Sequence, residues 1–199
     1  MKSLVHGIGV NSQDIPTRIN GKQTKEYKLW TDMLLRCTTK YWDKHPTYTG
    51  TACSENFKFY SFFYKWCQSQ VGFGNVGNDN RKWQIDKDLL VKNNTTYSEE
   101  VCIFLPQEIN SLTIDRRFGR GEYPVGVYFD SKWKKYVSRC CAGNGNKIFL
   151  GSFDCQVEAF QSYKTFKEAY IKQVAEQYKS QIDPRAYEAL LKYEVNIDD

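Results

Sequence analysis

The stretch GVYFDSKWKKYVSRCCAGNGNKIFLGSF, residues 126–153, decides the fold of the C-terminal part of this chain. It contains most of three short runs, 125–130, 134–141 and 147–153, that are rich in β-branched and aromatic residues. SKW and AGNGN separate the runs in the manner of hairpin turns. We therefore expect three antiparallel strands.

A helix is expected directly after the third run, over residues 156–181. Its apolar positions recur at helical spacing. They are Val157, Phe160, Tyr163, Tyr170 and Val174. Asp154 is placed to cap its first turn. One helix covers one face of a sheet, so the second face is left to solvent or to a ligand.

The open face of this sheet is expected to be basic and aromatic. Strand alternation would place on it some of Tyr128, Lys132, Lys135, Arg139 and Lys147. Between Arg116 and Phe149 the chain has eight basic and two acidic residues, an excess larger than the net charge of +5 of the whole chain. A surface of this kind suits a DNA groove.

Residues 124–175 resemble the Apetala-type, or ethylene-response-factor, DNA-binding domain. The features that carry the resemblance occur in order. They are Gly126-Val127, Lys132-Trp133, Leu150-Gly151 with Phe153, and Glu158-Ala159 with Tyr163. The resemblance implies that the sheet lies in the major groove of double-stranded DNA. The strand residues to which it gives contacts are Tyr128, Lys132, Trp133, Lys135, Arg139 and Lys147. Arg116, Arg117 and Arg120, in the basic linker before the domain, are expected to add DNA contacts.

Some aromatic residues of this region have a second interpretation. Trp133 either contacts DNA or anchors the hairpin from below, because tryptophan usually buries most of its ring. Core packing is expected for Phe149, Leu150 and Phe153. Lysine favours phosphate contact over bidentate recognition of a base, so the base-contacting residues stay open.

The N-terminal part is expected to be mainly helical. Residues 1–25 are rich in turn formers and predict an extended arm or loose hairpin. Apolar residues at spacings of three and four predict helices over 26–41 and 56–70, and a third helix is expected to begin near Pro106. Between Trp83 and Leu105 the pattern predicts a strand, a loop and a second strand or turn.

The segment WQIDKDLLVKNNTTYSEEVCIFLPQEIN, residues 83–110, resembles the HNH, or ββα-metal, nuclease motif of phage-type homing endonucleases that carry an Apetala-like domain downstream. The resemblance implies a metal site formed by Asp86, Asp88 and Asn110, with Mg²⁺ or Mn²⁺ as cofactor. It also implies that Asn93 or Asn94 fixes the loop.

The general-base histidine of that motif is absent from this segment. Only His6 and His45 occur in the chain. His45 is either catalytic, brought in by the fold, or a turn residue. Without it, Asp86 or Asp88 would serve as base as well as ligand. The alternative is that Asp86 and Asp88 form a solvated turn beside lysines and that Asn94 is an ordinary loop residue.

The expected fold class is α+β, with a helical and HNH-like N-terminal part followed by a three-stranded antiparallel sheet packed on one helix. The expected divisions are an arm (1–25), a helical region (26–114), a basic linker (115–123), the Apetala-type domain (124–181) and a tail (182–199). A short helix after Pro184 is expected to pack back on one of the modules. The seven cysteines contain no CxxC pair, so neither a disulfide framework nor a zinc knuckle is expected.

Two functions follow from these expectations. One is a Mg²⁺-dependent, site-specific DNA endonuclease of phage or mobile-element type; the other is an inactive DNA-binding regulator or site-occupying factor. A protein-binding module would need an apolar or acidic face, which the sequence does not single out. No apolar run is long enough for a membrane span, so we expect a protein that acts in the cytoplasm of a bacterial host cell, with no membrane partner and no small-molecule cofactor.

Overall fold

The structure is a computed structural model that describes residues 4–113, 121–142 and 146–199. The chain divides into two compact units. The first unit comprises Met1–Gln107 with Gln181–Ala186, and the second comprises Glu108–Ser180 with Tyr187–Asp199. Helices and antiparallel strands both occur, so the α+β class is confirmed.

The first unit is built on two helices, α1 (Lys25–Arg36) and α3 (Tyr60–Ser69), which pack on each other. Thr24 caps α1, because its hydroxyl accepts the N–H of Tyr27 at 3.3 Å. Trp30 is fully buried and its indole N–H donates to the carbonyl of Phe57 at 2.8 Å. Trp30 of α1 and Phe63 and Trp66 of α3 are buried in this core, as the helical spacing predicts. Phe59 and Phe62, which share that spacing, are exposed.

The expected helix over 26–41 is interrupted. α1 ends at Arg36, with Cys37 as its C-cap, and the extended Thr38 precedes a separate turn of helix, α2 (Thr39–Trp42). Short elements make up the remainder of this half of the unit. They are β1 (Arg18–Ile19), β2 (Lys22–Gln23), η1 (Pro46–Tyr48), β3 (Ala52–Cys53) and η2 (Asn56–Lys58). β1 and β2 form the loose hairpin expected in the N-terminal arm.

A strand–loop–strand follows in the first unit. β4 (Gln84–Asp86) pairs antiparallel with β6 (Ile103–Leu105). The loop between them contains β5 (Thr96–Tyr97), which pairs with β3. After Pro106 the chain enters α4 (Gln107–Leu112), so the expected order of strand, loop, strand and helix is present.

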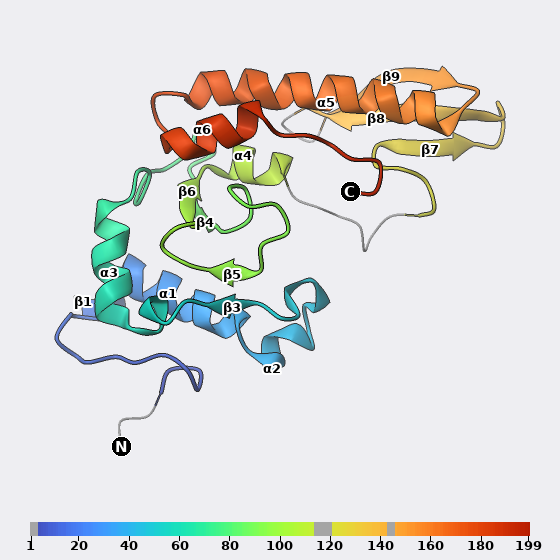
Figure 1. Ribbon diagram of the computed structural model, residues 1–199. Coiled ribbons are helices and arrows are strands. Elements are labelled where there is room, and N and C mark those ends of the chain that lie inside the picture. The colour runs from blue at the N-terminus through green and yellow to red at the C-terminus, as the bar shows by residue number, and fades with distance from the viewer. Residues whose placement is uncertain (1–3, 114–120, 143–145) are drawn as a thin grey trace. The chain divides into compact units, whose positions relative to one another are not determined.

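The second unit is a three-stranded antiparallel sheet packed on one long helix (Figure 1). Its strands are β7 (Val127–Asp130), β8 (Lys135–Cys141) and β9 (Lys147–Phe153), and its helix is α5 (Gln156–Tyr178). This architecture was predicted. Asp154 was expected to cap α5, and that prediction is wrong: Cys155 is the N-cap and makes no side-chain cap, while the Asp154 carboxylate pairs with Lys135.

The C-terminal tail completes the core between α5 and the sheet. The helix expected after Pro184 is α6 (Pro184–Leu191), and beyond it Val195 joins a buried cluster with Cys140 and Tyr163. The Val195 backbone is held at both ends, because its N–H donates to the Glu168 carboxylate at 2.9 Å and its carbonyl accepts from Lys164 at 2.8 Å. From Tyr187 onward the tail is thus part of the sheet-and-helix unit, whereas its first residues, up to Ala186, belong to the first unit.

Within the described ranges, no helix is long and apolar enough to cross a membrane.

Candidate nucleic-acid interface

One face of the sheet is covered by α5 and the other is open. Val127, Cys140 and Leu150 pack with Phe160 of α5. Neighbouring strand residues point to opposite faces, so Tyr128 lies on the uncovered side. We call the face that carries Tyr128, Arg139 and Phe149 the outer face.

The three side chains of the outer face lie side by side. Arg139 is opposite Phe149 in the β8–β9 register, and its guanidinium carbon lies 5.2 Å from the centroid of the Tyr128 ring. A guanidinium stacked on an aromatic ring is held in place while the N–H groups at its edge stay available. The outer face therefore presents an exposed cation over the Tyr128 ring and opposite Phe149 on the neighbouring strand.

Phe149 was expected in the core, and that prediction is wrong, because its side chain is 59% exposed. A β-bulge is the reason. Ser138 pairs with Gly151 but Arg139 pairs with Phe149, so Leu150 is an extra residue on β9. Strict alternation would put Phe149 on the same side as Gly151, whereas the bulge sends Leu150 to the core and Phe149 to the outer face.

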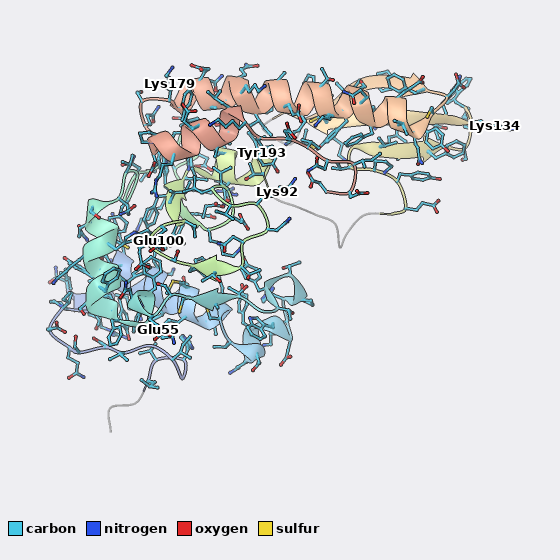
Figure 2. All side chains as sticks on the ribbon, in the orientation of Figure 1. Glu55, Lys92, Glu100, Lys134, Lys179 and Tyr193 are labelled. Carbon is cyan, nitrogen blue, oxygen red and sulfur yellow. The ribbon has the colours of Figure 1, made fainter. Side chains whose placement is uncertain are left out.

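The turn between β7 and β8 adds a further exposed aromatic residue, Trp133. The Asp130 carboxylate accepts the backbone N–H groups of Lys132 and Trp133 at 3.0 and 3.2 Å, which fixes the turn. Trp133 is 69% exposed, so it does not anchor the hairpin from below. The Lys132 ammonium lies 5.2 Å from a Trp133 ring centroid, and Lys134 lies at the tip of the hairpin (Figure 2).

The remaining predicted DNA-contact residues differ in availability. Lys147 is exposed and lies opposite Cys141 at the end of the sheet. Lys135 pairs with the Asp154 carboxylate, which offsets its charge. Arg116, Arg117 and Arg120 lie outside the described residues. Lys132, Lys134, Arg139 and Lys147 have no carboxylate partner in the part of the chain that the structure describes.

In the first unit, Asp86 at the end of β4 is a buried carboxylate. Its Oδ1 accepts the backbone N–H groups of Asp88 and Leu89 at 3.1 and 2.9 Å. Burial, and after it the negative charge of Asp88, raises the pKa of Asp86 to about 6. Asp86 thus fixes the turn that follows β4 while keeping an unusual affinity for its proton.

Asn94 closes the loop that Asp86 begins. Its side-chain amide donates to the carbonyls of Lys87 and Thr96 at 2.6 and 2.7 Å, and its Oδ1 accepts the N–H of Thr96 at 3.1 Å. The Lys87 ammonium donates back to the Asn94 carbonyl at 2.9 Å and pairs with Asp88 at 3.0 Å. Of the two candidate asparagines, Asn94 therefore holds the loop, and Asn93 is exposed.

The residues expected to form a metal site are divided between the two units. Asp86 and Asp88 are neighbours in the first unit, but Asn110 belongs to the second unit. His45 is exposed and stacks on the Tyr41 ring at 4.3 Å. Among the described residues, no three His, Cys, Asp or Glu side chains are grouped so that they could hold a metal ion. Asp86 is buried and its Oδ1 already accepts two backbone N–H groups, so Asp86 and Asp88 by themselves do not form an open Mg²⁺ site.

Asp86→Asn should alter how stability depends on pH. The carboxyl pKa is raised from 3.8 to about 6 on folding. The cost of ionising Asp86 is therefore absent below about pH 4 and complete above about pH 6, so stability falls over that interval. From pH 4 to pH 7 the wild type should lose on the order of 2 kcal/mol of unfolding free energy relative to the variant, whose amide oxygen still accepts both N–H groups.

Urea unfolding of both proteins at several pH values measures this difference. Asp79→Asn is the matched control, because the exposed Asp79 carboxylate likewise accepts a backbone N–H, that of Arg81 at 3.0 Å. The control should follow the wild type. Parallel curves for wild type and Asp86→Asn would show that Asp86 is not a strained buried acid.

Comparison of the chain with protein-family models, with curated proteins and with solved structures finds no match. Of the features that the resemblances imply, the structure shows one: in the second unit, a three-stranded antiparallel sheet packs on a long helix.

Proposed function

We propose that this chain is a double-stranded DNA-binding protein of phage or mobile-element type, and that the outer face of its sheet enters the major groove. The observation that carries the proposal is Arg139, stacked on Tyr128 beside the exposed Phe149 on an uncovered sheet. A planar guanidinium oriented in this way suits bidentate hydrogen bonding to guanine. The neighbouring aromatic ring suits contact with a thymine methyl group.

The shape and charge of the sheet support the same proposal. The major groove is about 12 Å wide and admits a two-stranded β-ribbon. The β7–β8 turn, at the start of β8, carries Lys132 and Lys134. Lys147 begins β9 opposite Cys141, at the other end of β8. Cations at the margins of a base-reading surface are placed to contact phosphates, which orient a protein on the duplex.

The exposed aromatic residues of this unit alone would also suit a protein partner, and salt dependence separates the two functions. Fluorescence anisotropy of a labelled random-sequence duplex should show affinity that falls steeply with salt, by about 0.9 logarithmic units per neutralised phosphate. The three unpaired lysines of the sheet and its turn, Lys132, Lys134 and Lys147, should therefore contribute about −3 to this slope. A failure to bind duplex DNA at low salt, or binding that is insensitive to salt, would contradict the proposal.

A second candidate function is Mg²⁺-dependent cleavage of DNA. The feature that favours it is the order of β4, a loop closed by Asn94, β6 and α4, with the buried Asp86 carboxylate at the end of β4. The alternative is the same DNA-binding protein without catalytic activity, acting as a regulator or site-occupying factor. The missing motif histidine favours this alternative.

Incubation with supercoiled plasmid separates these two. If the chain is a nuclease, it should nick the plasmid with Mg²⁺ or Mn²⁺ but not with EDTA. Asp86→Ala and Asn110→Ala should then lose that activity at least 100-fold, because the resemblance to the HNH motif makes both residues metal ligands. Asp79→Ala, at an exposed turn outside this segment, should keep it. Binding without nicking in every condition would leave the regulator or site-occupying factor.

A further inference from the structure

A cleft of about 340 Å³ lies in the first unit between α1 and β4. Lys25, Lys28 and Arg36 reach it from α1, and Lys82 reaches it from the residues before β4. Asp32 is the one acidic residue in its lining. The lining therefore has a net charge of about +3, although the cleft is far from the basic 116–149 region in the sequence.

Three of these cations are available to a ligand. Lys25, Lys28 and Lys82 are exposed, and none has an ion-pair partner in the portions of the chain described. The Lys25 side chain extends from α1 toward Gly74. Its ammonium would lie 3.6 Å from a methyl group added at Gly74. Arg36 is different, since its guanidinium donates to the Tyr97 hydroxyl at 3.1 Å. The three exposed lysines form what we call the lysine rim.

The wall of the cleft is partly apolar. It includes Trp83 and Phe104, which are 5% and 0% exposed. Low-dielectric walls of this kind concentrate the field of nearby cations. A small free anion would need donors that converge on it from within, whereas here the cations stand on the rim. The arrangement suits a polyanion that runs along the rim and keeps its own hydration on the outer side.

We propose that the lysine rim is a second DNA contact, which binds the sugar–phosphate backbone of the duplex that the outer face recognises. This inference rests on the proposed function, and it gives the first unit a role in that function. The rim would contribute affinity without base preference, because lysine contacts phosphate as a point charge. The proposed contact also places the sugar–phosphate backbone of DNA beside Ile85, the cleft residue that directly precedes Asp86.

The test compares two variants of the full chain that lose the same charge. One replaces Lys25, Lys28 and Lys82 with glutamine, and the control replaces Lys22, Lys40 and Lys44, which are exposed in the same unit but do not line the cleft. The probe is a labelled 30-base-pair duplex titrated at several salt concentrations. The rim variant should lower the salt slope by about 2 to 3 units and the affinity roughly 10- to 100-fold, whereas the control should change the slope by less than about one unit.

Further arms separate this inference from the proposed function. If Arg139→Ala weakens binding and the rim variant matches its control, the outer face stands and the rim is not a contact. If the rim variant weakens binding and Arg139→Ala does not, the rim stands and the proposed outer-face contact fails. Displacement of the duplex by millimolar inorganic phosphate or a deoxynucleoside monophosphate would assign the cleft to a small anion and overturn the inference. A wild-type chain that binds no duplex contradicts both.

Discussion

Gly126→Ala is expected to destabilise the second unit by about 3 kcal/mol or more, the largest effect of any single substitution considered for stability. Two costs combine at this position. Gly126 has a φ of +77°, a conformation that costs an L-residue about 1 to 2 kcal/mol. A Cβ there would also lie 2.0 Å from Cδ2 of Tyr163, a buried ring of the core cluster. The ring cannot move without displacing its neighbours in the core.

Thermal unfolding of the full chain checks this prediction. The transition of the second unit should fall by more than about 10 °C in Gly126→Ala. Gly121→Ala is the matched control, because nothing lies within 4 Å of its added methyl group. An unchanged transition in Gly126→Ala would mean that the approach of β7 to α5 differs from the one described.

Substitution of Arg139 is expected to have the largest effect on DNA recognition. Arg139→Ala removes both the cation and the planar group that stacks on Tyr128, and should weaken binding to a preferred duplex roughly 10- to 100-fold. Arg139→Lys keeps the charge but lacks the planar fork. It should therefore keep the salt slope and lose preference for the selected sequence.

The measurement begins with selection of bound duplexes from a randomised pool by the wild-type chain. Affinities for the selected duplex and for a scrambled one then give the specificity of each variant. Lys172→Ala, an exposed charge on α5, should leave specificity unchanged. If Arg139→Lys selects the same sequence with the same preference, Arg139 contacts phosphate instead of a base.

The second unit is predictable from the sequence because its signals are local. Strand runs, turn residues and the apolar stripe from Phe160 to Val174 are each read within a few residues of one another. The bulge is not, since nothing in KIFLGSF marks Leu150 as the inserted residue. The sequence therefore does not show which of the neighbours Phe149 and Leu150 faces the core. Asp154 precedes the helix, which predicts a cap, but a carboxylate at that place is equally able to pair with a lysine, and in the structure it pairs with Lys135.

In the first unit, neither the lysine rim nor the role of Asp86 can be predicted from sequence patterns. The lysine rim joins Lys25 and Lys28 to Lys82, more than fifty positions away. No periodicity predicts that approach, which depends on how α1 and β4 pack. In the IDKDLL segment, Asp86 has the same appearance in sequence whether its carboxylate binds a metal or accepts the N–H groups of Asp88 and Leu89. Only coordinates distinguish a turn former from a candidate ligand.

Photochemical cross-linking tests the central claim, that the outer face lies against DNA, most directly. Selected duplexes containing 5-iododeoxyuridine form adducts with nearby aromatic side chains on irradiation, and mass spectrometry locates them. The account predicts adducts at Tyr128, Trp133 or Phe149, the exposed aromatic residues of the outer face and its turn. Adducts found only on α5 or only in the first unit would contradict it.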